Sequence, residues 1–218
     1  NFISASISAL AGAAAGVLGA QSLATKSSDK AELTRELRIV NAANAITFTI
    51  CNSVLASKHQ YIHPLHDKFV SDTALVQESI AKAKSGQGPV HINIEADLSK
   101  FPVPEEPVEA LKTMLLQSNK LQGREFALLA MLEQSVNGLK GAIAQRNALC
   151  DEFALKDHTP DEFNYRYFGL KGRDGHTNRF YADTVSAIKL YSDDVAFFGS
   201  KLIEDLYESG VKIHKTLT

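Results

Sequence analysis

Three histidines at helical spacing are the residues of this sequence best suited to chemistry. His59, His63 and His66 are separated by four and three positions, and Asp67 follows directly. On an α-helix this spacing places the imidazoles on one face, where they and the carboxylate would suit zinc, copper or nickel. Pro64 lies inside the motif and would turn His66 away from the other ligands. A solvated helix surface is the simpler interpretation, so a metal-binding bundle is an alternative and not the main hypothesis.

A glycine-rich segment is the second candidate site. Residues 169–177 read Gly-Leu-Lys-Gly-Arg-Asp-Gly-His-Thr, and their basic groups are Lys171, Arg173 and His176. A helix that begins near Thr177 would direct its first amide groups at an anion bound to this loop. The spacing matches neither the Walker motif nor the dinucleotide motif, and an ordinary surface loop is the simpler interpretation.

The remaining reactive side chains do not converge on a catalytic pattern. Cys51 and Cys150 lie within apolar helical segments, where two buried free thiols are favoured over one disulfide. The chain has no Gly-x-Ser-x-Gly elbow for a nucleophile and no repeated Glu-x-x-His pair for a di-iron centre. The sequence therefore leans toward a non-enzymatic protein, and it predicts no cofactor apart from the divalent metal considered above.

Composition limits the class of partner. The chain has 218 residues, with 44% hydrophobic and 22% charged residues, which is ordinary for one large globular domain. Its net charge of -2 and its lack of tryptophan argue against a nucleic-acid surface. We therefore expect a protein partner or self-association, and no nucleic acid.

The first 25 residues differ from the rest of the chain. Residues 2–25 contain no charged side chain, and Gly12, Gly16 and Gly19 would let another helix approach closely. The run is long enough to span a membrane, but its serines and alanines make it weakly hydrophobic. A bundle helix is favoured over a membrane anchor, and an uncleaved signal is the weakest interpretation. Membrane association or export is slightly favoured over a purely cytoplasmic location.

Hydrophobic periodicity predicts a single all-α domain with long, kinked helices. Pro64 should kink or interrupt the helical arm at 26–88, and Ser27-Ser28-Asp29 should separate this arm from the helix at 1–25. Gly123 is a candidate break in the long helix at 105–157. Alternating residues at 90–95 and 163–168 predict a minor β element. The expected elements are a low-polarity helix at 1–25, a helical hairpin arm at 26–88, a linker at 89–104, a long helix at 105–157, an aromatic and glycine loop at 158–176, and a C-terminal helix at 177–218.

These elements predict an elongated bundle of about four helices. Ser192 and Gly199 are small residues in the apolar stripe of the last helix, and Gly12 and Gly16 would fit the groove that they leave. We therefore expect a non-enzymatic interaction or assembly protein whose apolar N-terminal helix docks into a bundle, an oligomer or a membrane. A toxin-like protein that inserts residues 2–24 into a bilayer is the first alternative, and the metal-binding bundle is the second.

Overall fold

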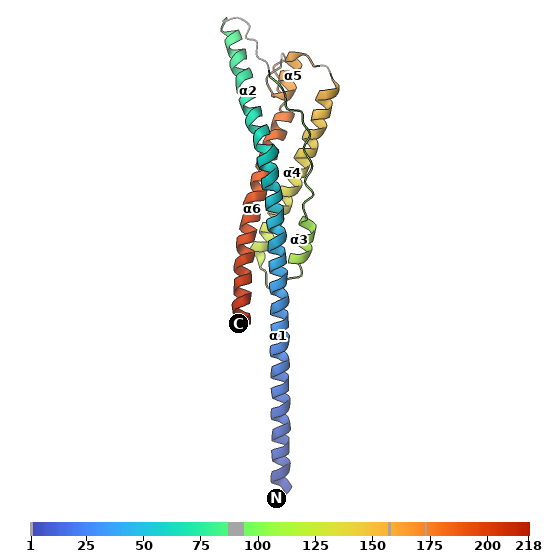
Figure 1. Cartoon of the computed structure of the whole chain (residues 1–218), viewed down its shortest axis with the longest axis vertical. Helices are drawn as coiled ribbons and strands as arrows, with labels where there is room; N and C mark the ends of the chain where they lie inside the picture. Colours follow the sequence, from blue (N-terminus) through green and yellow to red (C-terminus); the bar gives the residue numbers. More distant parts are fainter. Residues whose placement is uncertain (1, 87–93, 157, 173) are drawn as a thin grey trace.

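The chain is an elongated all-α protein, as predicted. The computed structural model describes residues 2–86, 94–156, 158–172 and 174–218, and for residues 2–23 it describes the backbone alone. Helices dominate these residues (Figure 1). No β-strand occurs among them, and the nearest approach to one is an isolated antiparallel bridge between Lys171 and Thr177.

The N-terminal third of the chain is one continuous helical rod. The helix α1 (Phe2–Ser57) leads into the π-helical segment η1 (Lys58–Ile62) and then into α2 (His63–Lys84). At 1.5 Å per residue the rod is about 125 Å long. Pro64 cannot donate a hydrogen bond to the carbonyl four residues earlier and collides with it, and the wider turn of η1 lies where this conflict must be absorbed.

Two predictions about this rod are wrong and one is confirmed. The interruption near Pro64 exists, but it is a local π-helical turn and does not reverse the chain, so residues 26–88 form no helical hairpin (Figure 1). The expected break at Ser27-Ser28-Asp29 is absent because α1 runs through it. Without glycine or proline, each of these residues weakens a helix by only about 0.5 kcal/mol.

The expected long helix at 105–157 is divided into α3 (Val108–Leu115) and α4 (Gly123–Leu155). A capping box begins α4, because the backbone N–H of Gln122 donates to the Glu125 carboxylate at 3.2 Å. The interruption therefore lies just before Gly123, the residue at which the sequence suggested a break.

The segment predicted as a strand at 163–168 forms part of α5 (Pro160–Tyr167), so that prediction is wrong. Thr159 caps this helix by accepting a hydrogen bond from the Glu162 amide at 3.3 Å, and Pro160 occupies its first turn. These N-terminal signals outweigh the alternation of aromatic residues. Of the other predicted strand, residues 90–93 lie outside the described residues.

The last helix, α6 (Phe180–Leu217), contacts both α1 and α4, and it runs antiparallel to both (Figure 1). Gly199 packs directly against the Sγ of Cys51 on α1, and Ser192 is also fully buried. Gly199 therefore lies at a close approach between α6 and α1. Cys51 occupies the space beside Gly199, so this space is not free for Gly12 and Gly16.

An extended segment, residues 94–107, covers the side of the bundle beside α4; we call it the strap (Figure 1). Arg146 of α4 is fully buried and donates to the strap carbonyls of Ser99 at 2.6 Å and Asp97 at 2.8 Å. Its guanidinium also lies 4.3 Å from the centre of the Phe101 ring. The strap and α3 thus complete the core beside the three long helices.

Candidate functional site: the end at which the N-terminal helix leaves the bundle

The uncharged N-terminal run extends past its own bundle. The ribbon of α1 continues well beyond the nearest ends of α3, α4 and α6, and the N-terminus is the most distant point of the molecule (Figure 1). Every residue from 24 to 32 is exposed, and Leu33 is the first residue of α1 described as packed against the core. The favoured expectation of a helix packed within this chain's own bundle is therefore not met.

A separate part of the same rod has the length and the apolar composition of a membrane-spanning helix. Within Ala24–Lys84 one window is long and apolar enough to cross a bilayer, and a third of it is buried inside the bundle. Val40, Ile50 and Val54 of this part of the rod belong to the core, so packing accounts for its buried third.

Seven basic residues surround the point at which α1 leaves the bundle, which we call the exit end. They come from residues 24–38, 116–122 and 209–218, in which Lys and Arg outnumber Asp and Glu seven to three. All seven are exposed, and no ion pair among the described residues uses any of them. We call this set the basic collar: Lys26, Lys30, Arg35, Arg38, Lys120, Lys212 and Lys215.

One of the three acidic residues at the exit end is fully occupied by the fold. Glu36 is buried, and its carboxylate accepts hydrogen bonds from the Ser118 hydroxyl at 2.6 Å and the Asn119 amide at 3.0 Å. These bonds fix the turn before α4 against α1. The Glu36 carboxylate therefore binds the turn and does not pair with a lysine of the collar.

Lys120 and Lys212 border a hollow of about 230 Å³ between α1, the turn before α4 and the last turns of α6. Two hydroxyl groups also line it, but Ser209 donates to Glu125 at 3.0 Å and Thr216 donates to the Lys212 carbonyl at 3.0 Å. The two ammonium groups are therefore the donors available to an anion. The same two lysines also line an adjoining hollow with Glu125, Asp205 and Glu208, of which Asp205 pairs with Arg124 and Glu125 accepts from Ser209.

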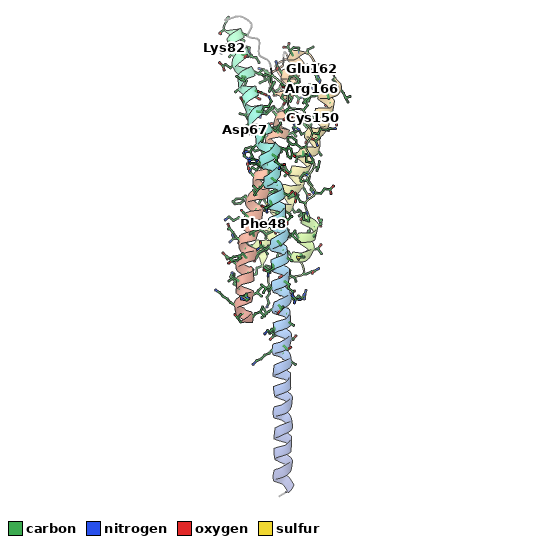
Figure 2. The ribbon with its side chains drawn as sticks, in the orientation of Figure 1. Phe48, Asp67, Lys82, Cys150, Glu162 and Arg166 are labelled. Carbon is green, nitrogen blue, oxygen red and sulfur yellow. The ribbon has the colours of Figure 1, made fainter. Side chains whose placement is uncertain are left out.

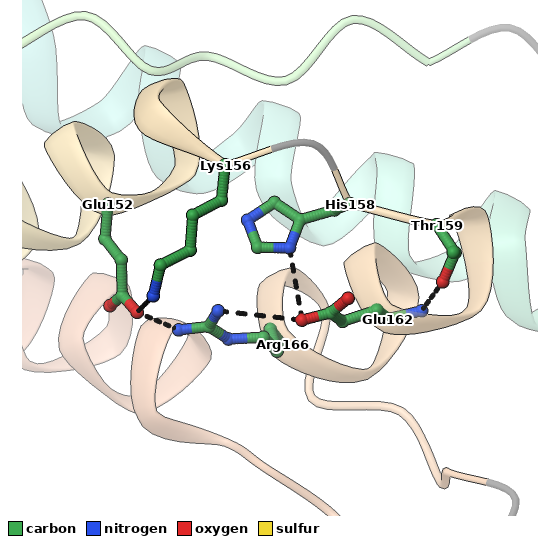
Figure 3. Close-up of polar contacts among 6 residues, drawn as sticks. All are labelled: Glu152, Lys156, His158, Thr159, Glu162 and Arg166. Carbon is green, nitrogen blue, oxygen red and sulfur yellow. Dashed lines mark hydrogen bonds and ion pairs between the residues drawn. The ribbon is translucent and has the colours of Figure 1, made fainter.

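Figure 2 shows Glu162 and Arg166 at the opposite end of the molecule, near α5, and Lys82 near the tip of α2. Glu152 accepts from Lys156 at 2.8 Å and from Arg166 at 2.5 Å (Figure 3). These two hydrogen bonds lower the pKa of Glu152 to about 2. The His158 side chain is only 5% exposed, and its Nδ1 lies 3.3 Å from Glu162. This cluster joins α4 to α5 and leaves little charge for a partner.

The histidines do not assemble a metal site. His59 and His63 are exposed, and the Nδ1 of His66 lies 3.5 Å from Asp67. Among the described residues, no group of three or more His, Cys, Asp or Glu side chains is arranged to hold a metal ion. The π-helical turn changes the spacing that would have aligned His59 with the others.

The glycine loop uses its own backbone groups. The Gly172 amide donates to the His176 carbonyl at 2.8 Å, and Lys171 lies opposite Thr177 in the isolated bridge. A neighbouring hollow is lined by the carboxylates of Asp161, Glu162 and Asp174, which would repel an anion. Arg173 lies outside the described residues, so anion binding by Lys171, Arg173 and His176 stays a prediction without further support.

Both cysteines are buried free thiols, as predicted. Burial raises the pKa of Cys51 and of Cys150, and for Cys51 the negative charge of Glu106 adds to this effect. A thiol with a raised pKa is mostly protonated at neutral pH and is a poor nucleophile. Their main role is packing, as the contact of Cys51 with Gly199 illustrates.

Comparison with protein-family models, curated proteins and solved structures finds no match to this chain. A functional hypothesis must therefore come from the geometry of the molecule itself. Sequence reasoning identified the uncharged run and its three glycines, but it missed the basic collar. The collar comes from three distant segments, so no local charge pattern in the sequence indicates it.

Proposed function

We propose that this chain is a non-enzymatic interaction and assembly protein that docks on a lipid bilayer through its N-terminal helix. The observation that carries the proposal is that α1 leaves the bundle while it bears no charge from residue 2 to residue 25. These 24 residues span about 36 Å as a helix, and a hydrocarbon core is about 30 Å thick. A helix also satisfies its own backbone hydrogen bonds, which a bilayer requires.

Self-association is part of the same proposal. Gly12 and Gly16 form a GxxxG pair, with Gly19 following, and such small residues let helices approach closely inside a bilayer. The toxin-like alternative uses the same segment and differs in its outcome, because it would make the bilayer permeable.

Flotation of the full chain with phosphatidylcholine vesicles tests the proposal. Ala14 lies at the middle of the uncharged run, where a lysine costs about 3 kcal/mol in a bilayer. We expect Ala14→Lys to weaken vesicle binding roughly a hundredfold. Ala31→Lys is the matched control, since it adds the same side chain at an exposed position outside the run.

The outcomes of this experiment separate the hypotheses. Binding by the wild type and Ala31→Lys, without binding by Ala14→Lys, supports bilayer docking. Equal binding by all three proteins, or no flotation of the wild type, would contradict it. Release of an encapsulated dye by the wild type would favour the toxin-like alternative over a passive anchor.

A further inference from the structure

We infer that the basic collar binds the phosphate-bearing headgroups of anionic lipids and so selects a negatively charged membrane. The inference rests on the proposed function, because it assigns a partner to the surface beside the inserted helix. It also goes further, since an uncharged helix alone has no preference among headgroups. The collar would add both the preference and a fixed orientation of the bundle on the membrane.

The spacing along α1 brings the collar to the level of the headgroups. If residues 2–25 occupy the hydrocarbon, Lys26 and Lys30 enter the headgroup layer directly. Leu33, which borders the hollow between Lys120 and Lys212, follows Thr25 by eight residues, or about 12 Å. A headgroup layer is about 6 Å deep, and the Debye length at physiological salt is about 8 Å. Lys120 and Lys212 therefore lie within electrostatic reach of the membrane surface.

The positive charges of the collar have no carboxylate partner among the described residues, while Arg35 donates a hydrogen bond to the Gln117 carbonyl at 3.1 Å. The seven basic side chains of the collar are exposed, and none belongs to an ion pair among the described residues. At the opposite end Lys82, Lys156, Arg166 and Arg179 each pair with a carboxylate of their own or a neighbouring helix. The exit end therefore gathers seven basic side chains without a carboxylate partner among the described residues, and it does so around the helix proposed to enter the bilayer.

The hollow between Lys120 and Lys212 provides a place for one phosphate group. Three separate segments border it, and they converge only in the folded bundle. Two ammonium groups can approach one phosphate from two sides, and each is expected to contribute about fivefold to binding near an anionic surface. A double substitution at this hollow is therefore the sharpest probe of the collar.

The test measures binding of the full chain to vesicles of phosphatidylcholine alone and of phosphatidylcholine with 30% phosphatidylserine. We expect stronger binding to the anionic vesicles, and a decrease in this preference as salt is raised. The variant with Lys120→Gln and Lys212→Gln should lose roughly thirtyfold in binding to anionic vesicles and nothing to neutral ones. Lys82→Gln with Lys84→Gln, at the tip of α2, is the matched control and should bind as the wild type does.

Failure of the inference differs from failure of the proposed function. Equal binding to both vesicles, or an unaffected Lys120→Gln and Lys212→Gln variant, overturns headgroup recognition and leaves bilayer docking in place. Binding to anionic vesicles that Ala14→Lys does not weaken overturns the inserted helix and leaves the collar. No binding to either vesicle overturns both. Full competition by glycerol phosphate at millimolar concentration would show a site for soluble phosphate and would overturn the assignment to a membrane surface.

Discussion

The two ends of this bundle carry basic residues in opposite ways. At the far end, near α5, basic side chains pair with carboxylates, and Glu152 alone accepts from both Lys156 and Arg166. At the exit end the seven residues of the basic collar have no such partners among the described residues. The far end uses charge to hold its own helices together. In the described part of the chain, the exit end leaves basic side chains without carboxylate partners, which is what an external anionic partner would require.

The largest effect on folding is expected from the clamp on the strap. Arg146→Ala removes two hydrogen bonds to the strap carbonyls, removes the contact with Phe101 and leaves a cavity. We expect a loss of about 3 kcal/mol in the free energy of unfolding, measured by urea denaturation. Lys212→Gln at the exit end should change it by less than about 0.5 kcal/mol. Equal effects of the two substitutions would remove the contrast between the ends.

A smaller effect is expected at the contact between α1 and α6. Gly199→Ala places a methyl group against the Sγ of Cys51, and such overpacking costs about 2 kcal/mol. Adding Cys51→Ala should restore most of that stability, because it removes the opposing atom. Gly141→Ala, which meets no atom within 4 Å, is the control and should stabilise α4 by about 0.5 kcal/mol. A double variant as unstable as Gly199→Ala would show that another contact limits this position.

The smallest effect concerns pH. The folded-state pKa of Glu152 is about 2, below its ordinary value of 4.5, because Lys156 and Arg166 donate to its carboxylate. Its ion pairs therefore stabilise the fold above pH 4.5, and this contribution is lost as the pH falls to about 2. Glu152→Gln should be slightly less stable than the wild type at pH 7, and the difference should shrink across that interval. Melting temperatures that differ equally at pH 7 and pH 2 would contradict this assignment.

Local signals predicted most of the helices and misplaced some of their ends. Pro64 correctly located the irregularity of the rod, because a proline disturbs the turn before it wherever the helix lies. The strand expected at 163–168 was wrong although Thr159 and Pro160 carried a clear helix start. There the alternation of aromatic residues was given more weight than the capping signals. The linker expected at 89–104 contains most of the strap, but local patterns could not predict its packing against α4, which depends on the buried Arg146.

What the sequence determined by itself is the uncharged run of residues 2–25, the long helical segments and the small residues of α6, because these follow from residue type and spacing. The tertiary structure decided which partners those features have. Gly199 meets Cys51 and not Gly12, and the strap completes the bundle in place of the N-terminal helix. Lys120 and Lys212 line one hollow because the last turns of α6 lie beside the turn before α4. Such contacts join residues tens of positions apart, so short-range patterns cannot specify them.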